Sequence, residues 1–357
     1  MAEEEFVDLR PEGEQEQKKK KSGCLIFLII FLSLLLVALI LVAVGMNYIF
    51  GRLGHFENPV PSDGTIPHMS DEFDVEGNQE GAETLETVDA SDVILETVDV
   101  LEGDMINIML IGQDRRPGEE RARSDSMILV TLNKEKNTIQ LTSFMRDLYV
   151  QIPGYMDTRL NAAYRYGGTD LMNETFKVNF GLEIDGNVMV DFDEFTEIIE
   201  ILGGVTLEIS SAEAKYMNNR SDSGKSFKAG VNYFNAEDAL TFTRMRYAAG
   251  GDYGRTDRQR RVLMAIAESF RDADLITIFN VIDQVLPHIV TNLSDAQIIE
   301  YATTGLSILG NGGTMETLRI PQDDAHYNAN IRGMAVLVPN LEMCREDLQE
   351  FIYDNEG

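Results

Sequence analysis

The chain lacks most of the residues on which common enzyme sites depend. Only four histidines occur, at positions 55, 68, 288 and 326. None lies between residues 105 and 287, which argues against a Ser-His-Asp or Cys-His triad in that part of the chain. The sequence also has no H-E-x-x-H zinc helix and no G-x-x-x-x-G-K-[ST] phosphate loop, and its Gly-Gly pairs lack a dinucleotide fingerprint.

Cysteine and positive charge are also scarce. The two cysteines are Cys24, inside an apolar run, and Cys344, so no disulfide framework is expected within one chain. Lysine and arginine total 30 against 60 acidic residues, which gives a formal net charge of −30. A general nucleic-acid binder needs a basic face. We therefore expect no nucleic-acid partner.

One long hydrophobic run stands near the N-terminus. Residues 24–46 are apolar apart from one serine and carry no charge. A helix of this length spans a hydrocarbon core of about 30 Å. A cleaved signal peptide is the alternative, but its apolar core is shorter, about 7–15 residues. The sequence therefore predicts a transmembrane helix over residues 23–50.

Four consecutive lysines, Lys18 to Lys21, lie just before this run. Basic residues favour the cytoplasmic side of a membrane. We therefore predict a single-pass protein of the cell membrane, with a cytoplasmic tail over residues 1–22 and the rest of the chain outside the cytoplasm. The tail is too short for a DNA-binding domain.

Composition divides the remaining chain into two parts. Residues 51–84 are rich in Gly, Pro, Asp and Glu with few large apolar residues, which is typical of a flexible, self-repelling spacer. Apolar residues return after residue 85. We predict an acidic extracytoplasmic linker over 51–84 and one extracytoplasmic domain over 85–357.

Within this domain, β-branched apolar runs alternate with segments of helical spacing. Such a mixture predicts an α/β fold in which helices cover both faces of a central mixed sheet. The expected strands are Met105–Ile111, Ser126–Leu132, Thr138–Phe144, Val205–Ile209 and Thr317–Ile320. The expected helices are Asn161–Asn179, Asp193–Leu202, a short helix capped by Asn235, and Thr256–Asp272.

Three doublets place two charged residues at positions i and i+2. In an extended segment such residues point to the same face, so each doublet can direct two charges into one pocket. The doublets are Asp114 with Arg116, Arg123 with Asp125, and Arg244 with Arg246.

A fourth group lies at the start of the predicted helix Thr256–Asp272. Arg255, Arg258 and Gln259 are spaced i, i+3, i+4 and are expected to share one face beside the positive end of the helix dipole. Arg146 and Asp147 add a charged pair after the third strand. Arg260 and Arg261 are expected to be solvated.

Arginine rather than lysine occupies every one of these cationic positions. Its planar guanidinium holds a phosphate through two hydrogen bonds, whereas lysine is a mobile point charge. Surface salt bridges with the abundant carboxylates are the alternative for each arginine taken singly. The paired spacing of the whole set favours a focused site for an anionic, phosphate-bearing substrate.

Asp114 and Asp125 have two interpretations. They are either ion-pair partners of Arg116 and Arg123, or ligands of Mg²⁺, which takes one or two carboxylates and completes its coordination with water and phosphate oxygens. Spacing alone does not separate the two.

An ordered set of motifs resembles the LytR-CpsA-Psr family. The motifs follow the family order over roughly residues 105–265: Asn107–Arg116, Arg123–Asp125, Ser143–Asp147, Asn161–Tyr164 with Gly167-Gly168, Ala239–Arg246 and Gly251–Gln259. The resemblance implies an α-β-α sandwich. It also implies a phosphotransferase that moves an anionic glycopolymer, such as teichoic acid or capsule, from a polyprenyl-(pyro)phosphate carrier to peptidoglycan.

The same resemblance assigns roles to residues. Asp114 and Asp125 match the family's magnesium-linked aspartates, and Arg244, Arg246 and Asp125 would carry catalysis. The positions that match phosphate-contacting residues are Arg123, Arg146, Arg244, Arg246, Arg255 and Gln259. The interval from Arg246 to Arg255 is one residue longer than the family spacing, which leaves Arg258 as an alternative to Arg255. Asp147 is a candidate general base or a structural ion-pair partner.

Two other functions remain open at this point. With water in place of the sugar hydroxyl, the site would be a polyprenyl-pyrophosphate hydrolase. Without turnover, the protein would be a membrane-anchored regulator that binds anionic wall polymer. The carboxylates favour catalysis, because negative charges beside the arginines bring no benefit to a pure anion binder.

Overall fold

The computed structural model describes residues 54–55, 84–101, 103–113, 124–221, 223–245, 251–271, 280–281 and 283–353. The predicted tail and transmembrane helix and almost all of the acidic linker lie outside these residues. Within the described part, no helix has the length and hydropathy that a membrane crossing requires. The predicted span and the domain boundaries therefore stay predictions.

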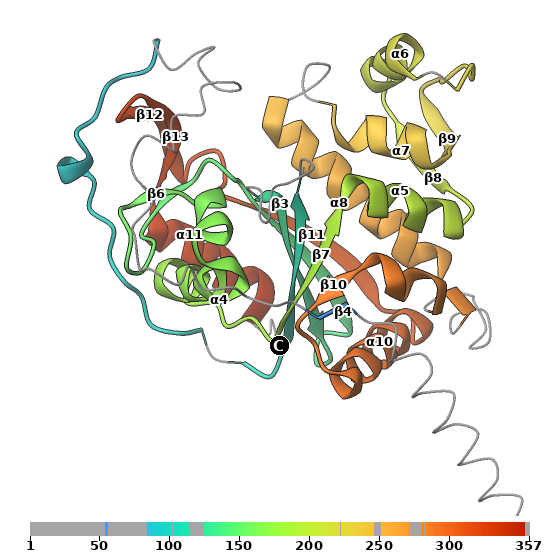
Figure 1. Cartoon of the computed structure of the whole chain (residues 1–357), viewed down its shortest axis with the longest axis horizontal. Helices are drawn as coiled ribbons and strands as arrows, with labels where there is room; N and C mark the ends of the chain where they lie inside the picture. Colours follow the sequence, from blue (N-terminus) through green and yellow to red (C-terminus); the bar gives the residue numbers. More distant parts are fainter. Residues whose placement is uncertain are drawn as a thin grey trace, which may run out of the picture. The chain divides into compact units, whose positions relative to one another are not determined.

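A seven-stranded sheet forms the centre of the domain (Figure 1). Its strands, in spatial order, are β1 (Gly54–His55), β10 (Val290–Thr291), β7 (Gly186–Asp191), β2 (Ile106–Gln113), β3 (Ser124–Asn133), β4 (Thr138–Phe144) and β11 (Thr314–Ile320). The pairs β7–β2 and β4–β11 are parallel, whereas β2–β3 and β3–β4 are antiparallel. The predicted mixed sheet is confirmed.

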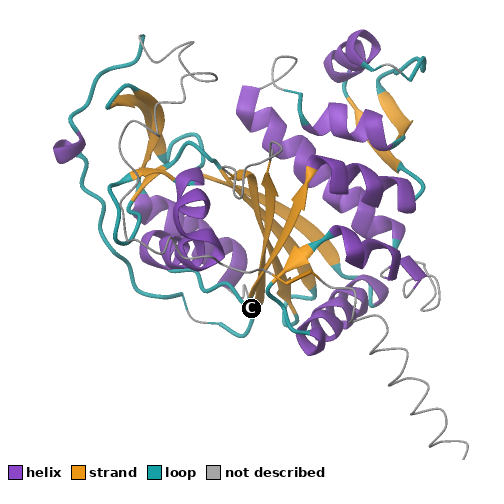
Figure 2. Cartoon of the chain, viewed as in Figure 1, coloured by secondary structure: helices purple, strands orange, loops and turns teal. Residues whose placement is uncertain are grey.

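Helices lie on both faces of this sheet (Figure 2). The helices are α4 (Asn161–Phe180), α5 (Phe192–Ile201), α6 (Ser211–Arg220), α7 (Ala236–Thr243), α8 (Gly251–Ser269), α10 (Asp295–Gly310) and α11 (Leu341–Leu348). Short 3-10 turns cover Ala90–Asp92 (η1) and Leu286–His288 (η2), and a π-helical turn covers Gln349–Tyr353 (η3). Three two-stranded sheets complete the fold: β5 (Tyr149–Val150) with β6 (Thr158–Arg159), β8 (Val205–Ile209) with β9 (Gly230–Phe234), and β12 (His326–Ile331) with β13 (Met334–Pro339).

Alternate residues of β3 supply the cores on the two faces. Met127 and Leu129 belong to the cluster that contains Phe176 of α4, whereas Ile128 belongs to the cluster that contains Ile308 of α10. Successive side chains of a strand point to opposite faces, so a strand of continuous apolar residues requires cover on both. The apolar run of β3 therefore lies between the helices that cover the two faces of the sheet.

Most predicted elements agree with the structure, but some boundaries differ; β11, for example, begins at Thr314 rather than Thr317. β4 and β8 match their predicted ranges, and Asn235 caps α7 by accepting a hydrogen bond from the Asp238 amide at 2.9 Å. Helix α8, however, begins at Gly251 rather than Thr256. Two glycines in its first turn have weak helix propensity. Contacts of Asp252 with other elements offset that weakness.

The strand directions bring several ends to one edge of the sheet. β7, β2, β4 and β11 all run in the same direction, so their last residues, Asp191, Gln113, Phe144 and Ile320, share an edge with the first residue of β3, Ser124. Arg146 lies two residues after the end of β4, Asp125 directly follows the first residue of β3, and Arg244 lies over Phe192, which follows the end of β7.

Candidate functional site

Arg146 lies at the centre of a cluster of carboxylates beyond the end of β4. Each of its three guanidinium nitrogens faces a different aspartate. Nη1 lies 2.6 Å from Asp125 Oδ1, Nε lies 3.5 Å from Asp147 Oδ2, and Nη2 lies 3.5 Å from Asp252 Oδ2. The carboxylates come from β3, from the residue after Arg146, and from the first turn of α8. The guanidinium therefore joins three separate segments.

Two more arginines form ion pairs with aspartates of this cluster. Arg159 Nη1 lies 3.3 Å from Asp147 Oδ1, and Arg255 Nη1 lies 3.5 Å from Asp252 Oδ1. Burial alone would lower the pKa of Arg146, but Asp147, Asp125 and Asp252 raise it above its ordinary value. The guanidinium is thus held firmly in its charged form, and the cluster alternates positive and negative groups.

The predicted grouping of Arg255, Arg258 and Gln259 on one face is wrong for Arg258. Gln259 faces the sheet edge, where its Oε1 accepts a hydrogen bond from Ser126 Oγ at 3.0 Å. Arg255 turns to Asp252. Arg258 is only 1% exposed, donates to the Met245 carbonyl, and lies 3.6 Å from Glu213.

The positions of these residues around the helix explain this division. Arg255 and Gln259 lie four residues apart on the side toward the sheet, whereas Arg258 points to α6 and the end of α7. Because the helix begins at Gly251, none of the three lies in its first turn. The predicted placement beside the positive end of the helix dipole is therefore also wrong. Asp252 occupies the first turn instead.

The expectation that Arg260 is solvated is wrong as well. Arg260 is 7% exposed, and burial lowers its pKa while the nearby Asp257 raises it. Its Nη2 lies 3.7 Å from Asp257 Oδ1. Arg261 is partly buried and lies 2.8 Å from Glu213 Oε1. Arg261 thus links α8 to α6, whereas the ion pair of Arg260 lies within α8 itself.

Arg244 lies elsewhere along the same sheet edge. It caps the C-terminus of α7 with right-handed helical backbone angles (φ −91°, ψ −4°), so the predicted extended conformation is wrong here. Its guanidinium carbon lies 4.5 Å from the centre of the Phe192 ring. Phe192 directly follows Asp191, the last residue of β7, and Arg244 is exposed.

The sheet order separates the two cationic centres. β7 and β4 are three strand spacings apart, about 14 Å at the usual distance between neighbouring strands. Arg244 and Arg146 therefore lie at two ends of a row of strand termini, with the end of β2 and the start of β3 between them. The predicted site residues Asp114, Arg116, Arg123 and Arg246 lie outside the described residues.

Asp125 is the candidate metal ligand that the structure describes. Its side chain is 28% exposed, and its Oδ1 is held by Arg146. Mg²⁺ prefers carboxylate oxygens and keeps several water or phosphate ligands, so one oriented carboxylate fits such an ion. The described residues contain no group of three or more His, Cys, Asp or Glu side chains suited to a metal.

Sequence reasoning missed several charged or titratable residues near this edge. The sequence did contain a signal for Asp252, because it precedes Arg255 by three residues, which is the spacing of an ion pair on a helix. Arg159 had none, since its contact with Asp147 depends on the return of the chain through β6. Tyr253 and His326, which form a hydrogen bond of 2.7 Å, come from segments far apart in the sequence.

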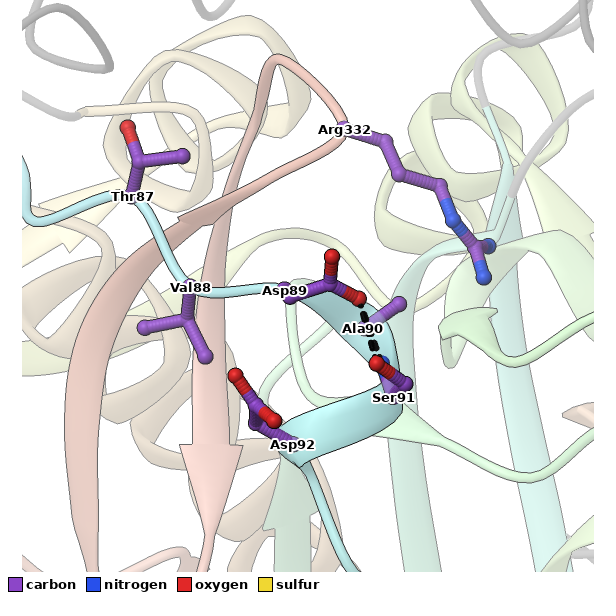
Figure 3. Close-up of a pocket in the computed structure, with 7 residues that line it drawn as sticks. All are labelled: Thr87, Val88, Asp89, Ala90, Ser91, Asp92 and Arg332. Carbon is purple, nitrogen blue, oxygen red and sulfur yellow. Dashed lines mark hydrogen bonds between the residues drawn. The ribbon is translucent and has the colours of Figure 1, made fainter.

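A shallow pocket on the N-terminal segment belongs to a different region (Figure 3). It is lined by residues 87–92 and Arg332. Asp89 Oδ1 accepts hydrogen bonds from the Ser91 amide at 2.9 Å and from Ser91 Oγ at 2.7 Å. These bonds cap a short 3-10 turn, and no residue of the Arg146 cluster lines the pocket.

Comparisons with known proteins identify the family and the fold. The sequence model of the LytR_cpsA_psr family matches residues 72–350. The "Polyisoprenyl-teichoic acid–peptidoglycan teichoic acid transferase TagU" of Bacillus cereus is 31% identical over 231 residues, which cover 64% of this chain and 72% of that protein.

Two solved structures share the fold. The structure titled "TagT bound to LI-WTA" has a TM-score of 0.58 and 25% sequence identity, and the match covers 72% of this chain and 96% of that one. The structure of Bacillus subtilis TagV has a TM-score of 0.57 and 29% identity, with 71% and 100% covered.

Proposed function

Because the chain belongs to the LytR_cpsA_psr family, we propose that it is a phosphotransferase that moves a polyprenyl-(pyro)phosphate-linked anionic glycopolymer, such as teichoic acid, to peptidoglycan. The name of its relative TagU states this activity for that protein. The observation that carries the proposal is the setting of Arg146, whose three nitrogens hold three carboxylates at the edge of the sheet.

The proposed phosphoryl transfer requires little covalent chemistry from the protein itself. In phosphoryl transfer, catalysis consists mainly of positioning groups and neutralising charge. A sugar hydroxyl of the acceptor attacks phosphorus, and the phosphorus–oxygen bond to the polyprenyl phosphate breaks. Arg244, with Arg123 and Arg246, would hold the phosphate oxygens, and Arg255 and Gln259 would line the opposite side.

Arg146 would act indirectly in this scheme, by orienting a candidate metal ligand. Its contact with Asp125 fixes the carboxylate that, with Asp114, would hold Mg²⁺; Asp114 directly follows Gln113, the last residue of β2. When bound, the ion would neutralise phosphate charge. The orientation of Asp125 thus depends on Arg146, and the orientation of Arg146 depends in turn on Asp147 and Asp252.

The location of the protein is part of the proposal. Residues 23–50 would form one transmembrane helix, with residues 1–22 in the cytoplasm and an acidic linker over 51–84. The catalytic domain after residue 85 would face outward, where a lipid-linked polymer in the membrane and peptidoglycan are both within reach.

Product analysis tests the proposed function. The full-length protein in detergent would be incubated with a polyprenyl-pyrophosphate-linked glycan, Mg²⁺ and peptidoglycan fragments. Glycan joined to peptidoglycan through phosphate supports the proposal. Release of free phosphate or of unattached glycan phosphate would indicate a hydrolase instead. Binding of the lipid-linked glycan without any turnover would indicate a regulator.

The Asp125→Asn substitution tests the metal assignment. We expect a lower transfer rate at limiting Mg²⁺ and partial recovery at excess Mg²⁺, because an amide oxygen is a weaker ligand than a carboxylate. The measurement is transfer rate against Mg²⁺ concentration. Glu268→Gln, at an exposed carboxylate on the far end of α8, is the matched control. Normal Asp125→Asn activity in the presence of a chelator would show that the metal assignment is wrong.

The Arg244→Lys substitution tests the phosphate assignment. Lysine keeps the charge but loses the planar group that lies over Phe192 and can grip two oxygens. We expect the transfer rate to fall about a hundredfold, as when one donor to a transition-state oxyanion is removed. The melting temperature should change little, since Arg244 is exposed. Turnover close to that of the wild type would place Arg244 outside the site.

A further inference from the structure

Tyr253 and His326 form a hydrogen-bonded pair beside the Arg146 cluster. Tyr253 lies in the first turn of α8, next to Asp252, and His326 is the first residue of β12. The Tyr253 Oη and His326 Nε2 atoms are 2.7 Å apart. The β12–β13 hairpin is itself joined to the cluster, because the Leu337 amide donates to the Asp147 carbonyl at 2.9 Å.

The hydrogen-bond partners of His326 determine which of its two ring nitrogens carries a hydrogen. The second ring nitrogen of His326, Nδ1, lies 2.8 Å from the Gln322 carbonyl oxygen. A carbonyl can only accept, so Nδ1 of the neutral ring carries the hydrogen. Nε2 then has a free lone pair and accepts the hydrogen bond from the Tyr253 hydroxyl. The pair is thus arranged to move a proton from Tyr253 to His326.

Charged groups from three sides surround the pair. Arg319 of β11 lies 4.1 Å from the centre of the Tyr253 ring and also pairs with Asp323. Burial raises the pKa of Tyr253; Arg319 lowers it, and the carboxylates of Asp323, Asp252 and Asp147 raise it again. The net shift is upward, so the phenol stays protonated at neutral pH. Tyr253 can therefore relay a proton but does not act as a base by itself.

We propose that Tyr253 and His326 together take the proton from the attacking sugar hydroxyl of the acceptor, a step that rests on the proposed transferase function. As the sugar oxygen bonds to phosphorus, its O–H bond breaks and the proton moves to Tyr253 Oη. The original phenolic proton moves to His326 Nε2. The polyprenyl phosphate leaves with the electron pair of the broken phosphorus–oxygen bond, and His326 later returns the proton to solvent.

The pair fits this task better than Asp147, the base candidate suggested by the sequence. Both carboxylate oxygens of Asp147 are held by arginines, at 3.5 Å from Arg146 and 3.3 Å from Arg159. Both oxygens of Asp147 therefore already face positive partners, whereas Nε2 of His326 faces a hydroxyl that can pass a proton to it. A neutral imidazole has an available lone pair, and general base catalysis of this kind contributes about 10²–10⁴-fold in rate.

Two substitutions test the relay in the full-length protein. Tyr253→Phe keeps the ring against Arg319 and removes only the hydroxyl. His326→Gln keeps hydrogen-bonding groups and removes the group that is protonated. We expect each to lower the rate of transfer to peptidoglycan fragments about a hundredfold or more, while binding of the polyprenyl-pyrophosphate-linked glycan changes less than threefold. Tyr327→Phe, at the next and exposed residue, and His288→Gln are the controls.

The pH profile distinguishes a relay from a structural clamp between α8 and β12. For the wild type, the transfer rate should fall in acid, because a protonated imidazole has no lone pair with which to accept a proton. His326→Gln should lose this dependence. A lower rate with an unchanged pH profile, or an unchanged rate, would overturn the relay. Failure of the wild type to transfer any glycan would overturn the proposed function, and the relay with it.

Discussion

Arg146→Lys is expected to lower the transfer rate by a hundredfold to a thousandfold. The three nitrogens of Arg146 face Asp125, Asp147 and Asp252 in three directions, and a single ammonium group cannot replace them all. The carboxylate of Asp125, a candidate Mg²⁺ ligand, would then lose its fixed orientation. Losses of this kind cost about 2.7–4 kcal/mol of transition-state stabilisation.

The measurement is kcat and KM for transfer at saturating Mg²⁺, with the melting temperature taken in parallel. Lysine retains the positive charge among the carboxylates, so the fold should persist. Arg220→Lys, at the exposed end of α6, is the matched control. A rate within threefold of the wild type would show that the cluster only holds segments together. Loss of folding together with activity would support the same conclusion.

Arg258→Met is expected to have the opposite signature, a large loss of stability with little loss of turnover. Arg258 is 1% exposed, and its removal leaves the Met245 carbonyl and Glu213 with fewer partners in the interior. Breaking a buried ion pair costs about 3–5 kcal/mol. Arg261 still pairs with Glu213, so the lower end of this range is expected, a fall of roughly 6–12 °C in melting temperature.

Thermal unfolding gives the stability, and turnover is measured well below the melting temperature of the variant. This pair of measurements also settles the choice between Arg255 and Arg258, which the sequence left open. A stable Arg258→Met protein that has lost transfer activity would place Arg258 in the site and contradict its structural role.

The positions of several strands along the chain were predictable because their signals are local. The apolar, β-branched runs at 138–144 and 205–209 predict β4 and β8 with their observed bounds. The cap at Asn235 is similarly local, since its side chain bonds to an amide three residues away. The start of α8 was not predictable in this way, because Gly251 and Gly254 are poor helix formers and the ion pair of Asp252 with Arg146 forms only in the folded chain.

For the candidate site, the sequence by itself determined which kind of chemistry was available. It contains paired arginines and aspartates without a nearby histidine triad, and the order of its motifs identifies the family. These properties depend on residue type and spacing, which need no folded chain. The same applies to the predicted membrane span, which follows from length and hydropathy alone.

Only the tertiary structure decided which charged residues act together. Arg255 and Arg258 are three residues apart in one helix, yet one contacts Asp252 and the other is buried against Met245. Asp125, Asp147 and Asp252 meet at Arg146 because β3, β4 and α8 end or begin at one edge of the sheet. Burial and ion pairing arise from packing between distant segments, and no local pattern encodes them.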